Sequence, residues 1–300
     1  MIKYNASKPT LIGIGEILWD HLPAGRQLGG APANFAYHVR AMGGGSAIIS
    51  AVGDDDPGRE ILHCLDRLGL NRTFVVTDSR HPTGIVAVSV DSHGVPAYTI
   101  RDNTAWDFIT FHPGMAALAD TADAVCFGSL CQRSPGSRRT IHEFLRATRP
   151  GCKRILDINL RQSFYSRQLI EESLRISNIL KLNDNELKVL AEMFGLVGNT
   201  SNQISQLLRI YPLELIALTR GPRGAVLYTR STSSECGGFP ASVVDTVGAG
   251  DAYTAALALG LLAGASLDDI NRRACCLAAF VCSQQGATPR IPAELAAKLF

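Results

Sequence analysis

Six short apolar runs recur along the chain, and longer segments with helical spacing lie between them. The runs are rich in Ile, Val and Leu: TLIGIG, SAIISAVG, ADAVCFGS, KRILDIN, NILKLN and ELIALT. Runs of this kind are typical of strands buried on both faces of a parallel sheet. Helical patterns occupy residues 31–42, 57–68, 134–148, 166–177, 183–194 and, in two pieces, 249–284. The alternation predicts an α/β fold with helices on both faces of a mainly parallel sheet.

Two of the expected helices carry recognisable start signals. Asp56 stands directly before Pro57, and proline is favoured in the first turn of a helix. Asn183 is followed three residues later by Glu186, which is the spacing of a capping box.

Two segments break the alternation of strands and helices. Residues 83–104 contain two apolar runs around a polar Asp-Ser-His-Gly turn, which indicates a hairpin. Residues 16–30 place extended apolar residues around Pro-Ala-Gly. The two segments either form one small β-sheet lid together or are unrelated surface hairpins. No repeat, low-complexity tract or linker interrupts the rest, so residues 1–300 are expected to form a single domain.

Composition narrows the class of protein. With 46% hydrophobic and 19% charged residues, 300 residues suit a soluble globular chain that buries a sizeable core. A net charge of +2 favours neither a nucleic-acid surface nor a polybasic membrane face. No apolar run approaches the roughly 20 residues of a membrane span, and the first residues lack a signal-peptide pattern. The eight cysteines form no CxxC or zinc-like set, so reduced cysteines and a cytoplasmic location are expected.

Several familiar site motifs are absent from the sequence. It has no GxxxxGK[ST] phosphate loop, no GxSxG elbow and no HExxH metal motif. The N-terminal GIGEIL lacks the third glycine of a dinucleotide-binding turn, which counts against a nicotinamide dehydrogenase.

The stretch DTVGAGD at 245–251 is the strongest candidate for chemistry. Small residues at 248–250 allow a tight turn, and a helix beginning near Ala249 adds its positive end, so the turn suits an anion. Asp251, in the first helical turn, can then accept a proton from a hydroxyl group beside that anion. The alternative interpretation is a glycine turn with an aspartate that merely caps the helix.

Two further glycine-rich turns follow apolar runs. LTRGPRGAVLY at 218–228 would let the backbone pass close to a ligand, or it is simply a hairpin with a proline turn. LGGAPANFAYHV at 28–39 places Asn34 in a first helical turn, or it is an ordinary helix start with Pro32 near its first position.

Taken together, these elements resemble the ribokinase-like carbohydrate kinases, also called the PfkB family. GGAPANFAYHVRAMGG resembles the N-terminal signature of that family and DTVGAGDAYTAALALGLL its C-terminal one. NDNE at 183–186 is similar to the Asn-x-x-Glu of the family, and TRGPRG at 219–224 to its Thr-x-Gly-x-x-Gly. The matches stand in the family's order from Leu11 to about Pro289. The resemblance implies a three-layer α/β/α fold with a small β-sheet lid formed by about 16–30 and 83–104.

The resemblance also implies roles for individual residues. Asp251 would be the catalytic base, with an anion hole formed by the backbone of Gly248, Ala249 and Gly250. The ATP site would be lined by Thr219, Gly221 and Gly224, with an apolar contact from Cys275 near the adenine. Glu186 and Asn183 would organise Mg²⁺ through water, and Asp245 would help to bind a monovalent cation such as K⁺.

On the sugar side, the resemblance implies hydroxyl contacts from Asp20, Gly30 and Asn34. Arg161 resembles the arginine of the DPNxR segment in fructokinases and 2-keto-3-deoxygluconate kinases, although Ile158 replaces the usual proline. The lid would close over the sugar, and in several members it pairs between subunits, so a homodimer is expected.

GGAPAN, and Leu18 two residues before Asp20, look more like fructokinases than ribokinases. We therefore expect transfer of the γ-phosphate of ATP to fructose at O6. The alternatives are a 2-keto-3-deoxygluconate kinase, whose acid Arg161 would pair, a ribokinase, and a sugar-binding relative that is regulatory rather than catalytic. No nucleic-acid or membrane partner is expected.

Overall fold

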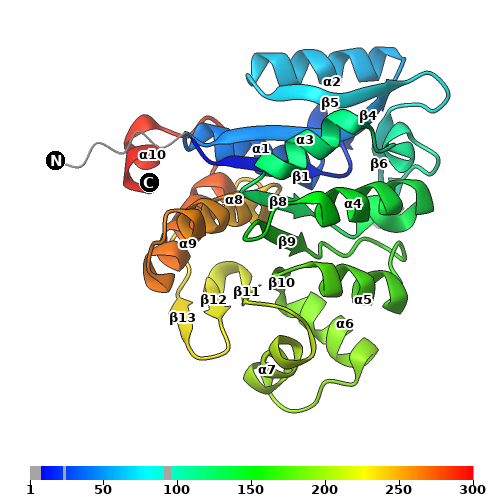
Figure 1. Cartoon of the computed structure of the whole chain (residues 1–300). Helices are drawn as coiled ribbons and strands as arrows, with labels where there is room; N and C mark the ends of the chain where they lie inside the picture. Colours follow the sequence, from blue (N-terminus) through cyan, green and yellow to red (C-terminus); the bar gives the residue numbers. More distant parts are fainter. Residues whose placement is uncertain (1–7, 23–24, 91–95, 300) are drawn as a thin grey trace.

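A central sheet of nine strands runs through the part of the chain that the computed structural model describes, residues 8–22, 25–90 and 96–299 (Figure 1). Its strands lie in the order β13-β12-β11-β10-β9-β8-β1-β4-β5. Their bounds are β1 Thr10–Ile14, β4 Gly45–Gly53, β5 Asn71–Asp78, β8 Ala124–Phe127, β9 Lys153–Asp157, β10 Ile179–Asn183, β11 Leu215–Thr219, β12 Ala225–Tyr228 and β13 Ser233–Cys236. From β5 to β11 all neighbours pair in parallel, and the last two pairings are antiparallel. The expected mainly parallel sheet is therefore present.

Alternate residues of the central strands feed two separate cores. Ile12 and Leu180 belong to one buried cluster, whereas their neighbours Leu11 and Ile179 belong to the other. This is why the strands read as continuous apolar runs: successive side chains point to opposite faces, and helices cover both.

The helices divide between the two faces in agreement with the core clusters. One face carries α1 Ala31–Ala41, α2 Asp56–Arg67, α8 Ala249–Leu262 and α9 Leu267–Cys282. The other carries α3 Pro113–Thr121, α4 Pro135–Ala147, α5 Arg167–Ile176, α6 Asp184–Phe194 and α7 Thr200–Ile210. Figure 1 shows α8 and α9 packed together, and the short α10 Ala293–Leu299 adds to their core. Three short 3₁₀ turns span η1 Ala105–Phe108, η2 Leu130–Arg133 and η3 Gly221–Arg223.

The helices expected from the sequence are present, with small shifts at their ends. The cap of α2 is Asp55, whose carboxylate accepts the N–H of Gly58, so the helix begins at Asp56 and not after it. The structure adds β5, β13, α3, α7 and α10, which the hydrophobic pattern did not single out. The edge strand β5 has mixed exposure because only one neighbouring strand covers it, and its sequence lacks the apolar run of a central strand.

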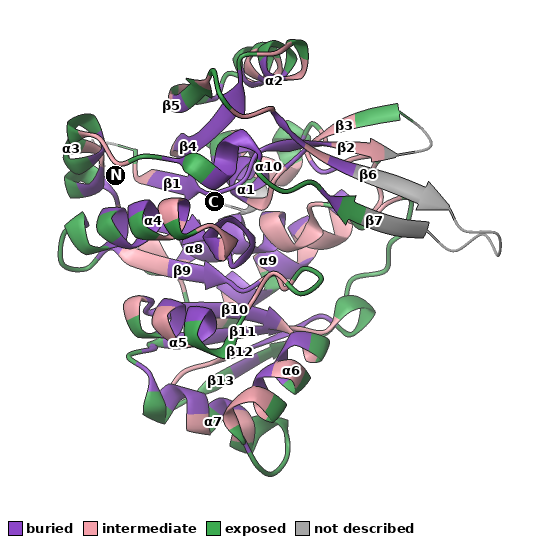
Figure 2. Ribbon diagram, turned by 90° about the vertical axis from the view of Figure 1, so that its right-hand side faces the viewer, coloured by how far each residue is buried: buried purple, intermediate pink, exposed green. Residues whose placement is uncertain are grey.

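The two irregular segments form one small sheet. Its strands are β2 Leu18–Leu22, β3 Gly25–Gly29, β6 Gly84–Val90 and β7 Pro96–Ile100, in the order β3-β2-β6-β7. Each segment is an antiparallel hairpin, and β2 pairs in parallel with β6, so the two are not unrelated. Figure 2 shows this sheet at one side of the molecule, apart from β9 and β10. The expected turns at 23–24 and 91–94 lie outside the described residues.

Within the described ranges, the structure contains no helix that is both long and apolar enough to cross a membrane.

Candidate functional site

A cleft of about 1230 Å³ lies where the carboxyl ends of the central strands face the small sheet and the loop before α8. In parallel α/β sheets, ligands bind at this end of the strands. The cleft is lined by all the residues that the sequence assigned to a site except Asp245, namely Asp20, Gly30, Asn34, Arg161, Asn183, Glu186, Thr219, Gly221, Gly224, Gly248, Ala249, Gly250, Asp251 and Cys275. Folding thus brings together residues that are separated by more than 200 positions in the chain.

Asp251 and Asn34 meet in the middle of this cleft. Asp251 lies in the first turn of α8, and its Oδ2 accepts a hydrogen bond of 2.8 Å from Nδ2 of Asn34 in the first turn of α1. Asn34 is buried, and within the described ranges its Oδ1 atom has no hydrogen-bond partner. Asn34 therefore orients the carboxylate of Asp251 and keeps one acceptor free at the cleft.

The carboxyl group of Asp251 has a raised pKa. Burial and the nearby Asp157 raise its pKa to about 6, while Asn34, Lys181 and Arg161 act in the opposite direction. A group with this pKa is ionised near neutral pH and still has a useful affinity for a proton, as a general base requires.

The turn before Asp251 has the left-handed backbone that only glycine adopts readily. Gly248 is the residue that caps α8, with φ 78°. A Cβ atom there would lie 2.6 Å from the carbonyl oxygen of Ala287, so the turn is also pressed against the 285–288 segment. Gly248, Ala249 and Gly250 thus place the N-terminus of a 14-residue helix at the cleft, and such a terminus attracts anions.

Three carboxyl groups and one guanidinium gather at the end of the cleft nearest the small sheet. Asp20, on β2, has a pKa raised to about 6, mainly by burial. Glu16, just after β1, has a pKa raised to about 7, again by burial, with a further contribution from Asp251. Arg161 is exposed, and its positive charge lowers the pKa of Glu16, Asp20 and Asp251 alike. This end of the cleft is therefore polar and rich in hydrogen-bond acceptors.

Sequence reasoning missed Glu16. Glu16 is only 3% exposed and lines the cleft. In the described part of the chain, its Oε2 atom has no hydrogen-bond partner. The signal was available, because an acidic residue directly after a buried parallel strand stands where ligands bind.

The burial of Glu16 makes a prediction about stability. Its pKa rises from 4.5 to about 7, so the folded state keeps a proton that the unfolded chain loses, and stability falls as pH rises through that window. Above pH 7 the cost is about 3 kcal/mol at ~1.4 kcal/mol per pKa unit. Glu16→Gln is therefore expected to raise the free energy of unfolding in urea at pH 8 by up to this amount, and to change it little at pH 4.

The matched control is Glu143→Gln, because Glu143 is exposed on α4. It should change stability by less than about 0.5 kcal/mol at both pH values. Equal effects of Glu16→Gln at pH 4 and pH 8 would show that Glu16 is not a buried carboxyl group with a raised pKa.

The opposite end of the cleft is formed by the hairpin of β11 and β12 and by α9. Thr219 ends β11, and its hydroxyl donates to the carbonyl of Leu182 at 3.3 Å. Gly224 directly precedes β12 at φ 78°, and a Cβ atom there would lie 2.1 Å from the carbonyl oxygen of Cys236. Cys275 is buried at the cleft wall. The segment TRGPRG is thus a hairpin turn that borders the cleft.

Asn183 and Glu186 form the capping box of α6. Asn183 Oδ1 accepts the N–H of Glu186, and Glu186 Oε2 accepts the N–H of Asn183 at 2.8 Å. Glu186 Oε1 accepts the N–H of Leu160, so the same carboxylate also holds the loop that carries Arg161. Burial raises the pKa of Glu186, whereas the charge of Lys181 lowers it.

This geometry suits the outer shell of a hydrated magnesium ion. The carboxylate of Glu186 is fixed by two backbone donors and lines the cleft, where its remaining lone pairs can accept from metal-bound water. In the described ranges, no group of three or more His, Cys, Asp or Glu side chains could hold a metal ion directly. Mg²⁺ bound here would thus rest mainly on water and phosphate oxygens.

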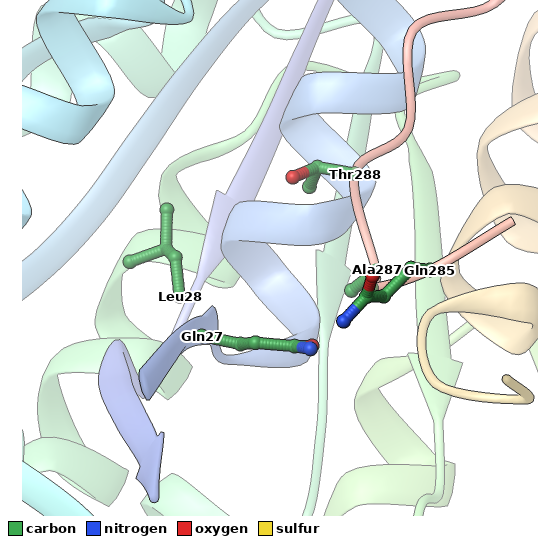
Figure 3. A pocket seen from close by; sticks show the side chains of 6 residues that line it. Gln27, Leu28, Gln285, Ala287 and Thr288 are labelled. Carbon is green, nitrogen blue, oxygen red and sulfur yellow. The ribbon is translucent and has the colours of Figure 1, made fainter. Parts of the chain in front are cut away.

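Asp245 lies outside the cleft and connects two loops. Its Oδ1 accepts the N–H of Val247 at 3.0 Å, and its Oδ2 accepts the N–H of Gly286 at 3.1 Å. A second, smaller cavity of about 320 Å³ lies close to these hydrogen bonds, between β3 and residues 285–288. Figure 3 shows the side chain of Gln27 reaching from β3 towards Gln285, while Leu28 points elsewhere. The segment that Asp245 holds therefore also meets the small sheet.

Sequence reasoning also missed a buried ion pair next to the turn formed by residues 248–250. Lys181 on β10 and Asp157 on β9 are partners in the parallel register, and Lys181 Nζ lies 3.0 Å from Asp157 Oδ1. Burial lowers the pKa of Lys181, but Asp157, Glu186 and Asp251 outweigh it, so the pKa lies above its usual value and the amine stays charged. The signal was a lysine and an aspartate inside the otherwise apolar runs NILKLN and KRILDIN.

Comparison with known proteins agrees with this geometry. Fructokinase of Klebsiella pneumoniae is 30% identical over 268 residues, which cover 86% of this chain and 86% of that protein. A putative sugar kinase of Pyrococcus horikoshii is 29% identical over 272 residues, 87% of this chain and 83% of that protein. The crystal structure of fructokinase with bound ATP from Xylella fastidiosa superposes with a TM-score of 0.84, covers 98% of both chains and is 22% identical.

These similarities confirm the three-layer α/β/α fold with a second small sheet. The family model described as pfkB family carbohydrate kinase matches residues 24–294, nearly the whole chain. This chain therefore belongs to the pfkB family of carbohydrate kinases, as the four motifs in its sequence indicated.

Proposed function

We propose that this kinase transfers the γ-phosphoryl group of ATP to a primary hydroxyl of a monosaccharide, and that its substrate is fructose, phosphorylated at O6. The observation that carries the proposal is the placement of Asp251. Its carboxylate, with a pKa of about 6, stands beside the glycine turn at the positive end of α8 and is oriented by Asn34. A base and an anion site side by side are what phosphoryl transfer to a hydroxyl needs.

In the proposed reaction, Asp251 accepts the proton of the sugar hydroxyl while the oxygen of that hydroxyl forms a bond to the γ-phosphorus. The bond between that phosphorus and the oxygen bridging to the β-phosphate breaks, and ADP leaves with the electron pair. The backbone N–H groups at Gly248, Ala249 and Gly250 stabilise the charge on the transferring group. The products are the sugar phosphate, ADP and a proton that Asp251 releases to solvent.

The rest of the cleft fits the remaining parts of this reaction. We place the nucleotide along Thr219, Gly221 and Gly224, with Cys275 on the apolar wall. Glu186 and Asn183 would hold Mg²⁺ through water, and the magnesium would neutralise phosphate charge when bound. Asp245 would act on K⁺ indirectly, by fixing loops whose carbonyl oxygens can bind it.

The charges at the sugar end favour a neutral sugar. Asp20, Glu16 and Asp251 lie near two cations, Arg161 and Lys181, but Lys181 is already paired with Asp157. A sugar acid would therefore bring one more carboxylate into a site where carboxyl groups outnumber the free cations. Asp20, Gly30 and Asn34 instead offer acceptors and backbone groups for hydroxyl groups, and Asn34 Oδ1 has no hydrogen-bond partner among the residues that the structure describes. Relatives named fructokinase support fructose. Arg161 is the observation that favours the second candidate, 2-keto-3-deoxygluconate.

The four-stranded sheet would serve as a lid. Its residues Leu18, Val86 and Ile100 border the sugar end of the cleft with apolar side chains, which would exclude water from the reacting hydroxyl. We propose that two subunits pair through this sheet, because β3 and β7 are its edge strands and an edge offers unpaired backbone groups. Sedimentation of the purified protein measures that state directly.

A panel of acceptors with Mg-ATP tests the substrate. We expect kcat/KM for fructose to exceed that for ribose, adenosine and 2-keto-3-deoxygluconate by at least about 10-fold, since each lost or mispaired hydroxyl contact costs on the order of 1 kcal/mol or more. The assay runs with and without K⁺ and couples ADP release to absorbance.

Two outcomes would change the proposal in different ways. A preference for 2-keto-3-deoxygluconate would identify Arg161 as a carboxylate-binding residue and replace fructose as the substrate. Binding of fructose in calorimetry without any ADP release would instead indicate a regulatory sugar-binding protein.

A further inference from the structure

The ammonium group of Lys181 lies directly behind the turn that precedes Asp251. A Cβ atom on Gly250 would stand 2.8 Å from Lys181 Nζ, so the amine contacts the underside of the turn. Lys181 lines the cleft and is 8% exposed. It comes from β10, two residues before the capping box at Asn183, and is therefore held by the central sheet and not by a mobile surface loop.

In the ion pair of Lys181 and Asp157, the lysine is the partner that faces the cleft. Asp157 Oδ1 lies 3.0 Å from the amine, and its Oδ2 accepts from the Thr254 hydroxyl at 3.2 Å. Thr254, one turn into α8, is also within 2.9 Å of the Gly250 carbonyl oxygen. Asp157 is 3% exposed and does not line the cleft, whereas Lys181 does. The positive end of the pair thus points to the cleft and the negative end points into the protein.

Buried ion pairs are weak contributors to folding, because the cost of desolvating two charges offsets most of their attraction. An apolar pair of similar volume would serve the sheet at least as well at these registered positions. The placement of Lys181 is better explained by the site in front of it, where negative charge collects: the side chains of Glu186 and Asp251 and, on the proposed function, the transferring phosphoryl group.

We infer that Lys181 is an electrostatic component of the phosphoryl-transfer site, with Asp157 and Thr254 as its positioning residues. Its ammonium charge reinforces the anion site made by the backbone at 248–250 and stabilises the charge that builds on the transferring group. Because the Lys181 amine is buried and held by Asp157, it does not have to reorganise during the reaction. The inference rests on the proposed function, since it assigns Lys181 a part in that same transfer.

The test compares Asp157→Asn with the double variant Lys181→Met/Asp157→Asn. Asp157→Asn removes the carboxylate that Lys181→Met alone would leave buried and unpaired, so the double variant keeps a core without an orphaned charge. We expect kcat of the double variant to be about 10²-fold below that of Asp157→Asn, the size of effect seen when one charge-stabilising group is lost. KM for the sugar and affinity for ADP should change little, because the charge acts on the transition state.

The matched control is Lys153→Met, which removes a lysine from an ion pair at the other end of β9. Lys153 Nζ lies 2.8 Å from Glu214, and neither residue lines the cleft. Its kcat should equal that of the unmodified protein. Urea unfolding of every variant confirms that the activity refers to folded protein.

The outcomes separate the inference from the function beneath it. If the unmodified protein phosphorylates a sugar and both Asp157→Asn and the double variant keep its kcat, Lys181 has a structural role only and the inference is wrong. If the double variant loses ADP affinity in proportion to kcat, Lys181 binds ground-state nucleotide and the transition-state role is again wrong. If the unmodified protein phosphorylates no sugar, the proposed function itself has failed.

Discussion

Asp251→Asn is expected to lower kcat by about 10³-fold, within the range that general-base catalysis supplies. An asparagine at this position can still accept the hydrogen bond from Asn34 Nδ2 through its amide oxygen, so the geometry of the cleft should survive. It cannot take a proton from the sugar hydroxyl. KM for the sugar should therefore change much less than kcat, and steady-state kinetics with Mg-ATP measures both.

The pH dependence gives the same prediction a second readout. The pKa of Asp251 is about 6, so kcat/KM of the unmodified protein should rise with pH up to about 6 and level off above it. In Asp251→Asn the part of this acidic limb that Asp251 contributes should be lost, and only the part from Asp20, whose pKa is also about 6, should remain.

Asp268→Asn is the matched control, because Asp268 is an exposed aspartate in the first turn of the neighbouring α9. It should leave kcat unchanged. Undiminished phosphoryl transfer by Asp251→Asn would mean that Asp251 is not the base, and the mechanism would have to be abandoned.

Gly248→Ala should produce the second largest loss, about 10²-fold in kcat. Alanine is strained at φ 78°, and its Cβ atom would meet the backbone of Ala287 at 2.6–2.7 Å. The turn must then move, and the N–H groups of Ala249 and Gly250 move with it. Because these groups act on the transferring phosphoryl, kcat should fall more than the affinity for the sugar.

Gly264→Ala separates backbone strain from the effect on the site. Gly264 follows α8 at φ 67°, and a Cβ atom there would meet nothing within 4 Å. Both variants should lose about 1 kcal/mol of stability from the left-handed backbone, and Gly248→Ala more because of its contact. Only Gly248→Ala should lose activity. An equal loss in both would show that the 248–250 turn has no special part in the reaction.

Local patterns in the sequence were sufficient for the architecture. Continuous apolar runs at β1, β8, β9, β10 and β11 predicted parallel strands buried on both faces, and the structure has them in one sheet. The capping box at Asn183 and Glu186 was predicted correctly, because its bonds join residues three apart. The edge strand β5 and the helix α3 were not predicted, because their sequences carry no clear periodic pattern. The amphipathic spacing of α7 was present in the sequence and was missed.

The motifs indicated which residues belong to the site, but the sequence did not show how close these residues lie in space. Asn34 and Asp251 are 217 residues apart, and only the packing of α1 against α8 brings them to 2.8 Å. The same holds for the small sheet: two hairpins were expected, and the parallel pairing of β2 with β6 made them one.

The fold class, the family and 14 of the residues that line the cleft could be predicted from the chain, because strands, caps and glycine turns are encoded by short-range patterns. The pKa values and the charge arrangement of the site could not be predicted from the chain, because they depend on how the chain packs. Burial is a property of the packed chain, and burial raises the pKa of Glu16 to about 7 and that of Asp251 to about 6. The register of β9 against β10 likewise makes Lys181 and Asp157 an ion pair whose positive end faces the cleft.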